Sequence, residues 1–149
     1  MSLVDRISGH FGRYVAARSD AELASLMFGW RRRPLLWGIF RIAPHRLDRD
    51  ATAGEQTLIE IRVSDPRGGT PFRRQLLIGR GRCRVSRHDH GETDSTVTFD
   101  PVSFLRFAAG QQGARDLFVS RRVSVDGSLL TAAELPSFFR FPKPFEHPG

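Results

Sequence analysis

The sequence predicts an α+β protein, and three observations support this class. The chain has 149 residues, of which 40% are hydrophobic and 26% are charged, as is typical of one folded domain. Apolar residues recur at helical spacing before residue 55 and alternate as in strands after it. The single cysteine, Cys83, excludes an internal disulfide and a multi-cysteine zinc site as sources of stability. We therefore expect a helical lead-in over residues 1–54 and a larger part over residues 55–149, joined in one compact unit.

The lead-in is predicted to hold three helices. The first carries an apolar stripe at helical spacing, formed by Val4, Ile7, Phe11 and Val15. Ser19 and Glu22 have the spacing of a capping box, which begins the second helix. The apolar residues of this second helix are Ala24, Leu26, Met27 and Trp30. Pro34 fits the first turn of a third helix, Pro44 would end it, and the polar residues 48–54 are interpreted as a connection.

Five strands are predicted after residue 55, over residues 57–64, 72–79, 82–86, 96–99 and 122–126. In the first of them, Ile59, Ile61 and Val63 fall on one face, while Glu60 and Arg62 fall on the other. The segments between strands have turn chemistry, such as the Asp-Pro-Arg-Gly-Gly run at residues 65–69. This alternation predicts a sheet with one face against a core.

One helix is predicted between the fourth and fifth strands, and another after the fifth. Asp100 and Pro101 supply an N-cap followed by a first-turn proline. The apolar side of the helix that they begin is formed by Phe104, Leu105 and Ala108. Gly110 is expected to stop this helix, Gly127 precedes the last one, and Pro136 interrupts it.

No group of residues has the pattern of a catalytic or metal site. His88 and His90 lack a third ligand nearby, so a solvated turn is the better interpretation. Ser86 and Ser103 do not lie in a nucleophile motif, and Cys83 is expected to be an inert, buried thiol. We therefore expect no enzymatic activity, no bound metal and no cofactor.

The chain is strongly basic. It carries 23 Lys and Arg against 16 Asp and Glu, for a net charge of +7 and a pI near 11.2. Such a chain is attracted to phosphates, whether of nucleic acid or of anionic lipid. A basic nucleic-acid-binding module is an alternative supported only by this charge and by the alternating Arg80, Arg82 and Arg84. Since strand aromatics are few and recognisable nucleic-acid modules are absent, we expect no nucleic-acid partner.

A second basic cluster, Arg31, Arg32 and Arg33, lies between Trp30 and an apolar run that contains Trp37. Arginines beside apolar anchors are typical of a segment that binds an anionic membrane surface, although an ordinary solvated rim is the alternative. The first 20 residues lack the pattern of a secretory signal. Residues 34–40, the most apolar run, are far fewer than the ~20 residues of a spanning helix. We expect a cytoplasmic protein that contacts membranes transiently, at their surface.

Two segment pairs give the sequence a family resemblance. They are Thr96–Phe99 followed by Ser103–Gly110, and Leu117-Phe118 followed by Arg122–Gly127. In this order and spacing they resemble the sterol-carrier-protein lipid-transfer domain. The segment Gly68-Gly69-Thr70-x-Phe72 is similar to the glycine-rich entry into the second strand of that family. The resemblance covers roughly residues 55–135.

The resemblance implies a five-stranded, mostly antiparallel sheet, covered on one face by helices that enclose an apolar tunnel. It also implies non-catalytic lipid binding and transfer, with a sterol, fatty-acyl or isoprenoid tail in the tunnel. The candidate lining residues are Ile59, Ile61, Leu76, Ile78, Val97, Phe99, Phe104, Leu105, Ala108, Leu117, Phe118, Val123, Val125, Leu135, Phe138 and Phe139. The alternative is that these side chains pack against one another as a dry core.

Two further interpretations stay open. Phe118-Val-Ser-Arg-Arg122 bears a looser resemblance to accessory lipid carriers of isoprenoid-quinone synthesis. A regulatory or assembly domain with a vestigial cavity is the other. The sequence does not determine the lipid, the state of the tunnel or the oligomeric state.

Overall fold

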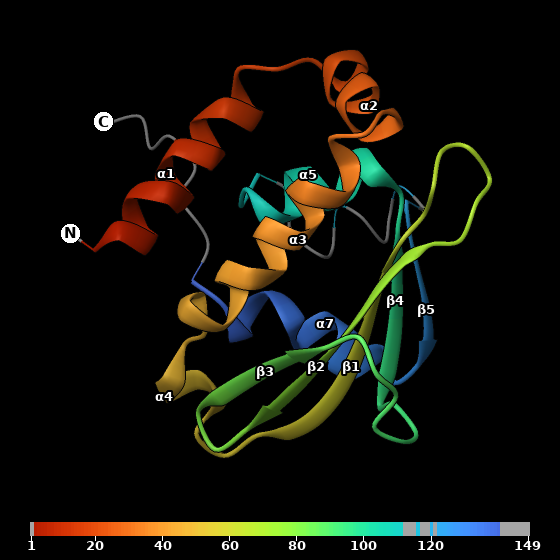
Figure 1. Cartoon of the computed structure of the whole chain (residues 1–149). Helices are drawn as coiled ribbons and strands as arrows, with labels where there is room; N and C mark the ends of the chain where they lie inside the picture. Colours follow the sequence, from red (N-terminus) through yellow and green to blue (C-terminus); the bar gives the residue numbers. More distant parts are fainter. Residues whose placement is uncertain (1, 112–115, 117–119, 121, 141–149) are drawn as a thin grey trace.

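The computed structural model of the chain describes residues 2–111, 116, 120 and 122–140, and places helices on one side of a five-stranded sheet (Figure 1). The α-helices are α1 (Leu3–Ala16), α2 (Asp20–Phe28), α3 (Arg32–Ile42), α4 (Arg49–Thr52), α5 (Pro101–Ala108) and α7 (Leu129–Glu134). Two 3₁₀ helices are η1 (Ala43–Arg46) and η2 (Leu135–Phe138). The strands are β1 (Gln56–Val63), β2 (Phe72–Gly79), β3 (Arg82–Ser86), β4 (Ser95–Phe99) and β5 (Val123–Gly127). This is the predicted α+β fold with an N-terminal helical extension.

The helices begin where side chains satisfy their first amide groups. The predicted capping box of α2 is confirmed, since the Ser19 hydroxyl accepts a hydrogen bond from Glu22 N and the Glu22 carboxylate accepts one from Ser19 N. The predicted cap of α5 is confirmed as well, because the Asp100 carboxylate accepts a bond from Ser103 N at 3.1 Å. Local sequence rules therefore place these helix starts correctly.

Two expectations about the lead-in are wrong. Residues 48–54 are not only a connection, since Asp48 caps the short helix α4 by accepting bonds from the amides of Asp50 and Ala51. Trp30 is not part of the second helix, because α2 ends at Phe28 and the Trp30 side chain is 79% exposed. The Asp48 cap thus begins a helix within a polar run, and the turn after Phe28 ends α2 before the last apolar residue of the predicted pattern.

The sheet has the strand order β3-β2-β1-β4-β5. Neighbouring strands are antiparallel except β1 and β4, which run parallel with Ile61 opposite Val97. The inner face, toward the helices, carries Ile59, Ile61 and Val63 of β1, as the alternation predicts. All three side chains are buried, which confirms that this face contacts the core.

One hydrophobic core joins the lead-in to the sheet. Phe40 of α3 stacks on Phe72 of β2 and on Phe104 of α5, with ring centroids 5.8 and 5.4 Å apart. Phe104 also meets the edge of Phe99 of β4 at 5.4 Å. These ring contacts join α3 and α5 to the sheet in one core. Aromatic pairs of this kind contribute roughly 0.5–1.5 kcal/mol each beyond the effect of their buried area.

The outer face of the sheet holds a buried carboxylate. Glu60 is on this face, as predicted, yet its side chain is only 3% exposed. Its oxygens accept hydrogen bonds from Arg62 at 2.5 Å, Arg73 at 3.0 Å and Gln75 at 3.0 Å. Burial alone would raise the pKa of Glu60, but the hydrogen bonds from Gln75 and Arg62 and the positive charges beside it lower the pKa below its ordinary value. Glu60 is therefore ionised and fully partnered within the fold.

Candidate functional site

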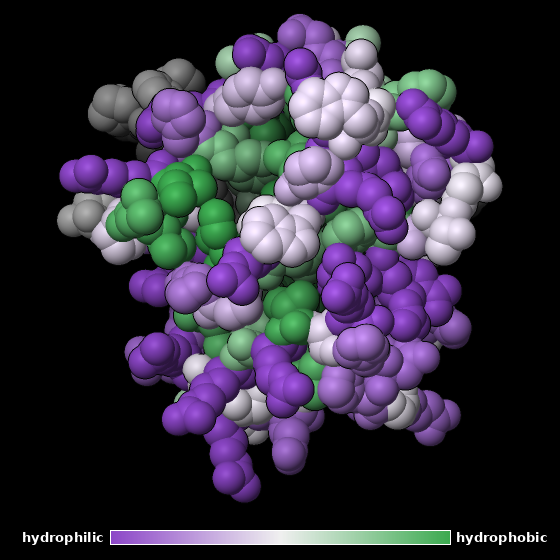
Figure 2. Space-filling model, in the orientation of Figure 1, coloured by the Kyte–Doolittle hydropathy of each residue, from purple (hydrophilic) through white to green (hydrophobic). Residues whose placement is uncertain are grey.

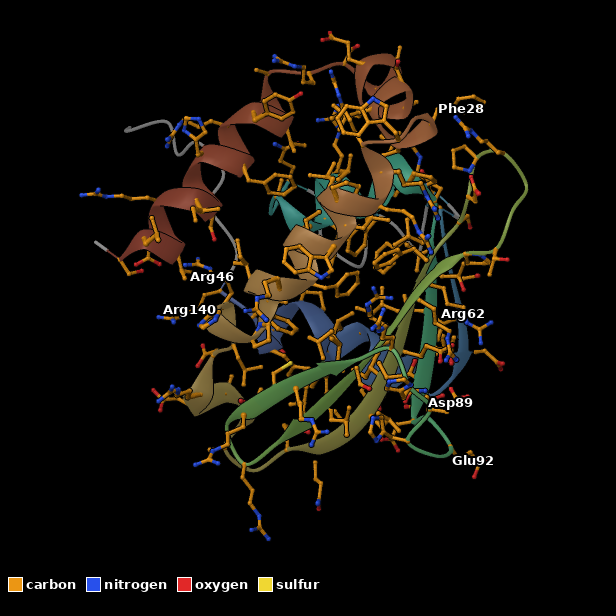
Figure 3. The ribbon with its side chains drawn as sticks, viewed as in Figure 1. Phe28, Arg46, Arg62, Asp89, Glu92 and Arg140 are labelled. Atoms are coloured by element: carbon orange, nitrogen blue, oxygen red, sulfur yellow. The ribbon has the colours of Figure 1, made fainter. Side chains whose placement is uncertain are left out.

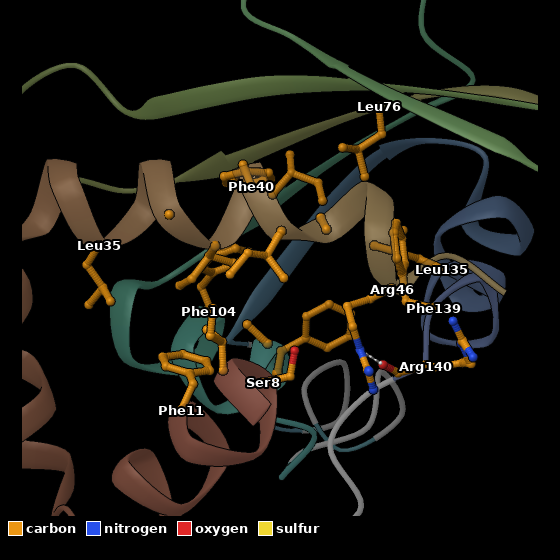
Figure 4. A pocket seen from close by; sticks show the side chains of 18 of the residues that line it. Ser8, Phe11, Leu35, Phe40, Arg46, Leu76, Phe104, Leu135, Phe139 and Arg140 are labelled. Atoms are coloured by element: carbon orange, nitrogen blue, oxygen red, sulfur yellow. Dashed lines mark hydrogen bonds between the residues drawn. The ribbon is translucent and has the colours of Figure 1, made fainter. Parts of the chain in front are cut away.

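An apolar cavity of about 290 Å³ lies between α1, α3, α5 and the inner face of the sheet (Figure 4). Its walls are almost entirely hydrocarbon. On the face seen in Figure 2, hydrophobic side chains fill a hollow between α1 and α3 and are flanked by hydrophilic ones. A space of this kind binds an apolar group without a specific polar contact, because removal of apolar area from water supplies the free energy.

Six of the residues predicted to line a tunnel lie on the wall of this cavity. They are Ile61, Leu76, Phe104, Ala108, Leu135 and Phe139. The strands β1 and β2 supply the first two, α5 the next two, and η2 with the residue after it the last two. The inner face of the sheet and the covering helix therefore meet at the cavity.

Most of the other predicted lining residues lie elsewhere in the core. They are Ile59, Ile78, Val97, Phe99, Leu105, Val123 and Phe138, which are buried, and Val125, which is partly buried; none lines the cavity. Phe99 shows the reason, since the rings of Phe107 and Phe104 occupy the space beside its own ring, with centroids 5.1 and 5.4 Å away. The alternation of apolar residues identifies the inward face of a strand. It does not show at which positions a side chain from a covering helix fills the space next to that face. Leu117 and Phe118 lie outside the described residues.

The lead-in supplies a large part of the wall, which the sequence interpretation missed. These side chains are Ile7 and Phe11 of α1 and Leu35, Ile39, Phe40 and Ile42 of α3. The apolar stripe of α1 is visible in the sequence, but the sequence interpretation gave it no packing partner. Such a stripe indicates a helix face that packs against another part of the fold. Helices before residue 55 thus complete the cavity that the later part begins.

The cavity has one polar end, formed by Ser8, Arg46 and Arg140. The Arg46 guanidinium donates from Nε to the Arg140 carbonyl at 2.7 Å and from Nη1 to an Asp5 carboxylate oxygen at 2.5 Å. Hydrogen bonds from Ser2 and the adjacent Arg46 lower the pKa of Asp5 below its ordinary value. Figure 3 shows Arg46 and Arg140 side by side below α1. The charged side chains of the cavity wall therefore lie at this end, whereas the rest of the wall is hydrocarbon.

Four of the five residues predicted to contact a membrane surface are exposed. Trp30 and Trp37 are 79% and 58% exposed, and Arg31 and Arg33 are exposed as well, with the Arg31 guanidinium 5.5 Å from the Trp30 ring. Arg32 requires a correction. It is buried at the first turn of α3, where Nη2 donates to the carbonyl of Val63 at 3.1 Å. Arg32 closes the end of β1 and is not available to a surface.

Three of the polar side chains considered for a catalytic or metal site are Cys83, His88 and His90. Burial raises the pKa of the Cys83 thiol to about 12, so the reactive thiolate is scarce at neutral pH. His88 and His90 are exposed. Among the residues that the structure describes, no three His, Cys, Asp or Glu side chains are grouped to hold a metal ion. Across the same residues, no helix combines the length and apolar character needed to cross a membrane.

Comparison with known proteins identifies one family and several solved structures of similar fold. A model of the SCP-2 sterol transfer family matches residues 43–140, whereas no curated protein matches the sequence. Sterol carrier protein 2 from Yarrowia lipolytica is 16% identical with a TM-score of 0.56, over 70% of this chain and 86% of that one. The ubiquinone synthesis protein UbiJ-SCP2 is 17% identical with a TM-score of 0.54, over 71% and 94%. Palmitated SCP2L2 from Aedes aegypti is 16% identical with a TM-score of 0.52, over 66% and 88%.

Proposed function

Because this chain belongs to the SCP-2 sterol transfer family, we propose that it is a non-catalytic lipid carrier that holds one apolar tail in the cavity. The observation that carries this proposal is the cavity itself, about 290 Å³ with a hydrocarbon wall built from both parts of the chain. Each methylene group that leaves water contributes about 0.8 kcal/mol, so a long tail offsets the cost of ordering it.

The size of the cavity favours a single, narrow tail. Ligand sites in proteins commonly measure ~300–1,000 Å³, and the 290 Å³ of this cavity is at the lower limit of that range. The palmitated Aedes aegypti structure supports a fatty-acyl tail. A volume at this limit favours one fatty-acyl or isoprenoid chain over a bulkier ligand.

A role in isoprenoid-quinone synthesis is the second candidate. Its support is the similarity in fold to the ubiquinone synthesis protein UbiJ-SCP2. Both roles use the same cavity and differ in the head of the lipid, since a quinone precursor carries an aromatic ring at the end of its isoprenoid tail. The identity of the bound lipid therefore separates the two.

We expect the purified chain to carry lipid. Native mass spectrometry should show one bound molecule per chain, and extraction should release a fatty-acyl or a prenylated aromatic lipid. Lipid-free protein at every expression condition, together with no uptake of added fluorescent fatty acid, would contradict the proposal. Co-purifying nucleic acid that only high salt removes would instead support a nucleic-acid-binding module.

We propose further that the exposed aromatic and basic side chains at the start of α3 contact the membrane during delivery. Trp30 and Trp37 are amphipathic rings suited to the interface between lipid and water. Arg31 and Arg33 stand beside them, and neither makes an ion pair with a described residue. Each basic residue near an anionic leaflet contributes about 1 kcal/mol, which falls as salt screens it.

The Arg31→Gln/Arg33→Gln double variant should bind anionic vesicles about thirtyfold more weakly than the parent, because two such charges contribute about 2 kcal/mol. Co-sedimentation with phosphatidylglycerol vesicles at low salt measures this. The matched control is Arg82→Gln/Arg84→Gln, which removes two exposed arginines from β3. An equal loss in both double variants would show that net charge, and not this surface, governs vesicle binding.

A further inference from the structure

Helix α1 covers one side of the cavity and lies at the edge of the molecule, apart from the sheet (Figure 1). It precedes residues 43–140, the segment that the family model matches. Its side chains Ile7, Ser8 and Phe11 line the cavity. Solvent nevertheless reaches the beginning of this helix, since Leu3 is 71% exposed and Ile7 is 42% exposed. The cavity is therefore separated from water on this side by a single helix.

The C-terminal part of α1 is firmly attached to α5 and to the segment after it. Val15 belongs to the hydrophobic core and is 1% exposed. The Arg106 guanidinium donates to the Val15 carbonyl at 3.1 Å and to the Arg18 carbonyl at 3.0 Å. The Gln111 amide donates to the Gly12 carbonyl at 3.1 Å. Hydrogen bonds from a charged donor are strong, so this end of the helix is fixed.

The first half of α1 is attached more loosely. Among the residues that the structure describes, the polar contact between this half and the rest of the fold is the ion pair of Asp5 with Arg46. The Asp5 carboxylate is 45% exposed, and an ion pair that is open to solvent adds little stability. On the cavity side, Ile7 faces the empty space. This half therefore needs less free energy to move than the fixed end does.

A weak point of the helix lies between the two halves, at Ser8-Gly9. Glycine in a helix interior is less stable than alanine, and helices bend sharply at pairs of glycine and serine. Packing does not require a glycine at this position. Among the described residues, a Cβ on Gly9 would approach no atom more closely than Nη1 of Arg13, at the ordinary contact distance of 3.5 Å. Gly9 therefore favours bending without serving a close contact.

We propose that residues 3–8 of α1 form a lid, which bends away at Ser8-Gly9 and admits the lipid tail to the cavity. The Asp5–Arg46 ion pair is the latch that holds this lid closed. The open lid leads into the hollow between α1 and α3, where hydrophobic side chains are gathered (Figure 2). This inference rests on the proposed function, because a lid has an effect only if a tail enters the cavity.

The test measures the uptake and the release of a fluorescent fatty acid by stopped flow. A lid on the entry path changes both rates by the same factor, so the Kd, which is their ratio, stays constant. Asp5→Asn removes the latch from outside the cavity wall and should accelerate both rates about fivefold, the upper limit for an exposed ion pair. Gly9→Ala should slow both rates about fourfold, because alanine stabilises the unbent helix.

Two controls isolate the latch from the general effect of charge. Asp50→Asn makes the same chemical change at an exposed position of α4, outside the cavity wall, and should exchange the ligand at the rates of the parent. Added salt should accelerate exchange in the parent and leave Asp5→Asn unchanged, because salt screens an ion pair that solvent reaches.

A covalent lock provides a test that does not depend on the size of a rate change. The variant Asp5→Cys/Arg46→Cys/Cys83→Ser is joined across the latch with a bifunctional maleimide. The joined protein should neither take up nor release the fatty acid. The same variant treated with N-ethylmaleimide keeps an open latch, and should exchange the ligand faster than the parent.

The results separate the lid from the carrier function. Exchange through the joined protein at the rate of the N-ethylmaleimide form overturns the lid and leaves the carrier function standing. Equal rates in Asp5→Asn and the parent have the same meaning, as does a changed Kd in Asp5→Asn with only one rate altered. Failure of the parent to bind the fatty acid overturns the proposed function, and the lid with it.

Discussion

Replacement of Ala108 by phenylalanine is expected to abolish binding of a fluorescent fatty acid. Ala108 is on the cavity wall, one turn after Phe104 on α5. A ring at this position would project into the 290 Å³ space and occupy the volume that the tail needs. Because the new side chain enters an existing cavity and not a filled core, the free energy of unfolding should change by less than the roughly 1–3 kcal/mol typical of overpacking.

The control for this variant is Ala24→Phe, which adds the same ring to an exposed position of α2. It should bind the fatty acid as the parent does. Titration of the fluorescent ligand, with circular dichroism to verify the fold, measures both variants. If folded Ala108→Phe binds with unchanged affinity, the tail does not occupy this cavity.

Replacement of Glu60 by alanine is expected to have the largest effect on stability, roughly 1–3 kcal/mol, because its buried carboxylate is lost while its arginine partners remain partly exposed. The variant leaves Arg62, Arg73 and Gln75 without the carboxylate that accepts their hydrogen bonds. Arg73 also bonds Asp89, and Gln75 accepts a bond from the His90 amide at 3.0 Å, so the segment after β3 loses its anchor on the sheet. Urea denaturation measures the loss, and a loss below 1 kcal/mol would contradict this account.

The dependence on pH provides a second measurement on Glu60. Its pKa is lower in the folded state than in the unfolded state, so the folded protein holds the proton less tightly. The resulting stability is fully present above the unfolded pKa of about 4.3, and is lost as the pH falls through the lowered pKa. Glu60→Gln should therefore lose less stability than the parent between pH 5 and pH 3, because it has no carboxylate to protonate. Parallel curves would show that other groups control acid unfolding.

Local patterns in the sequence were sufficient for most elements. The Ser19 box, the Asp100 cap and the alternation of Ile59, Ile61 and Val63 each depend on residues within one turn or one strand. Those interactions form whatever the rest of the chain does, so they can be read from the sequence. The family resemblance then supplied a five-stranded, mostly antiparallel sheet, whereas the strand order and the parallel pairing of β1 with β4 come from the structure.

What only the tertiary structure decided is which inward side chains surround empty space. Phe99 and Ala108 have equally inward positions in the sequence, but aromatic neighbours fill the space beside Phe99 while the cavity is open at Ala108. Likewise, Arg31, Arg32 and Arg33 are chemically identical neighbours, yet only Arg32 turns inward to the Val63 carbonyl. The sequence by itself determined the fold class and the family resemblance. Packing between segments distant in the chain decided the wall of the cavity and its polar end, because a void and a buried charge are properties of several elements together.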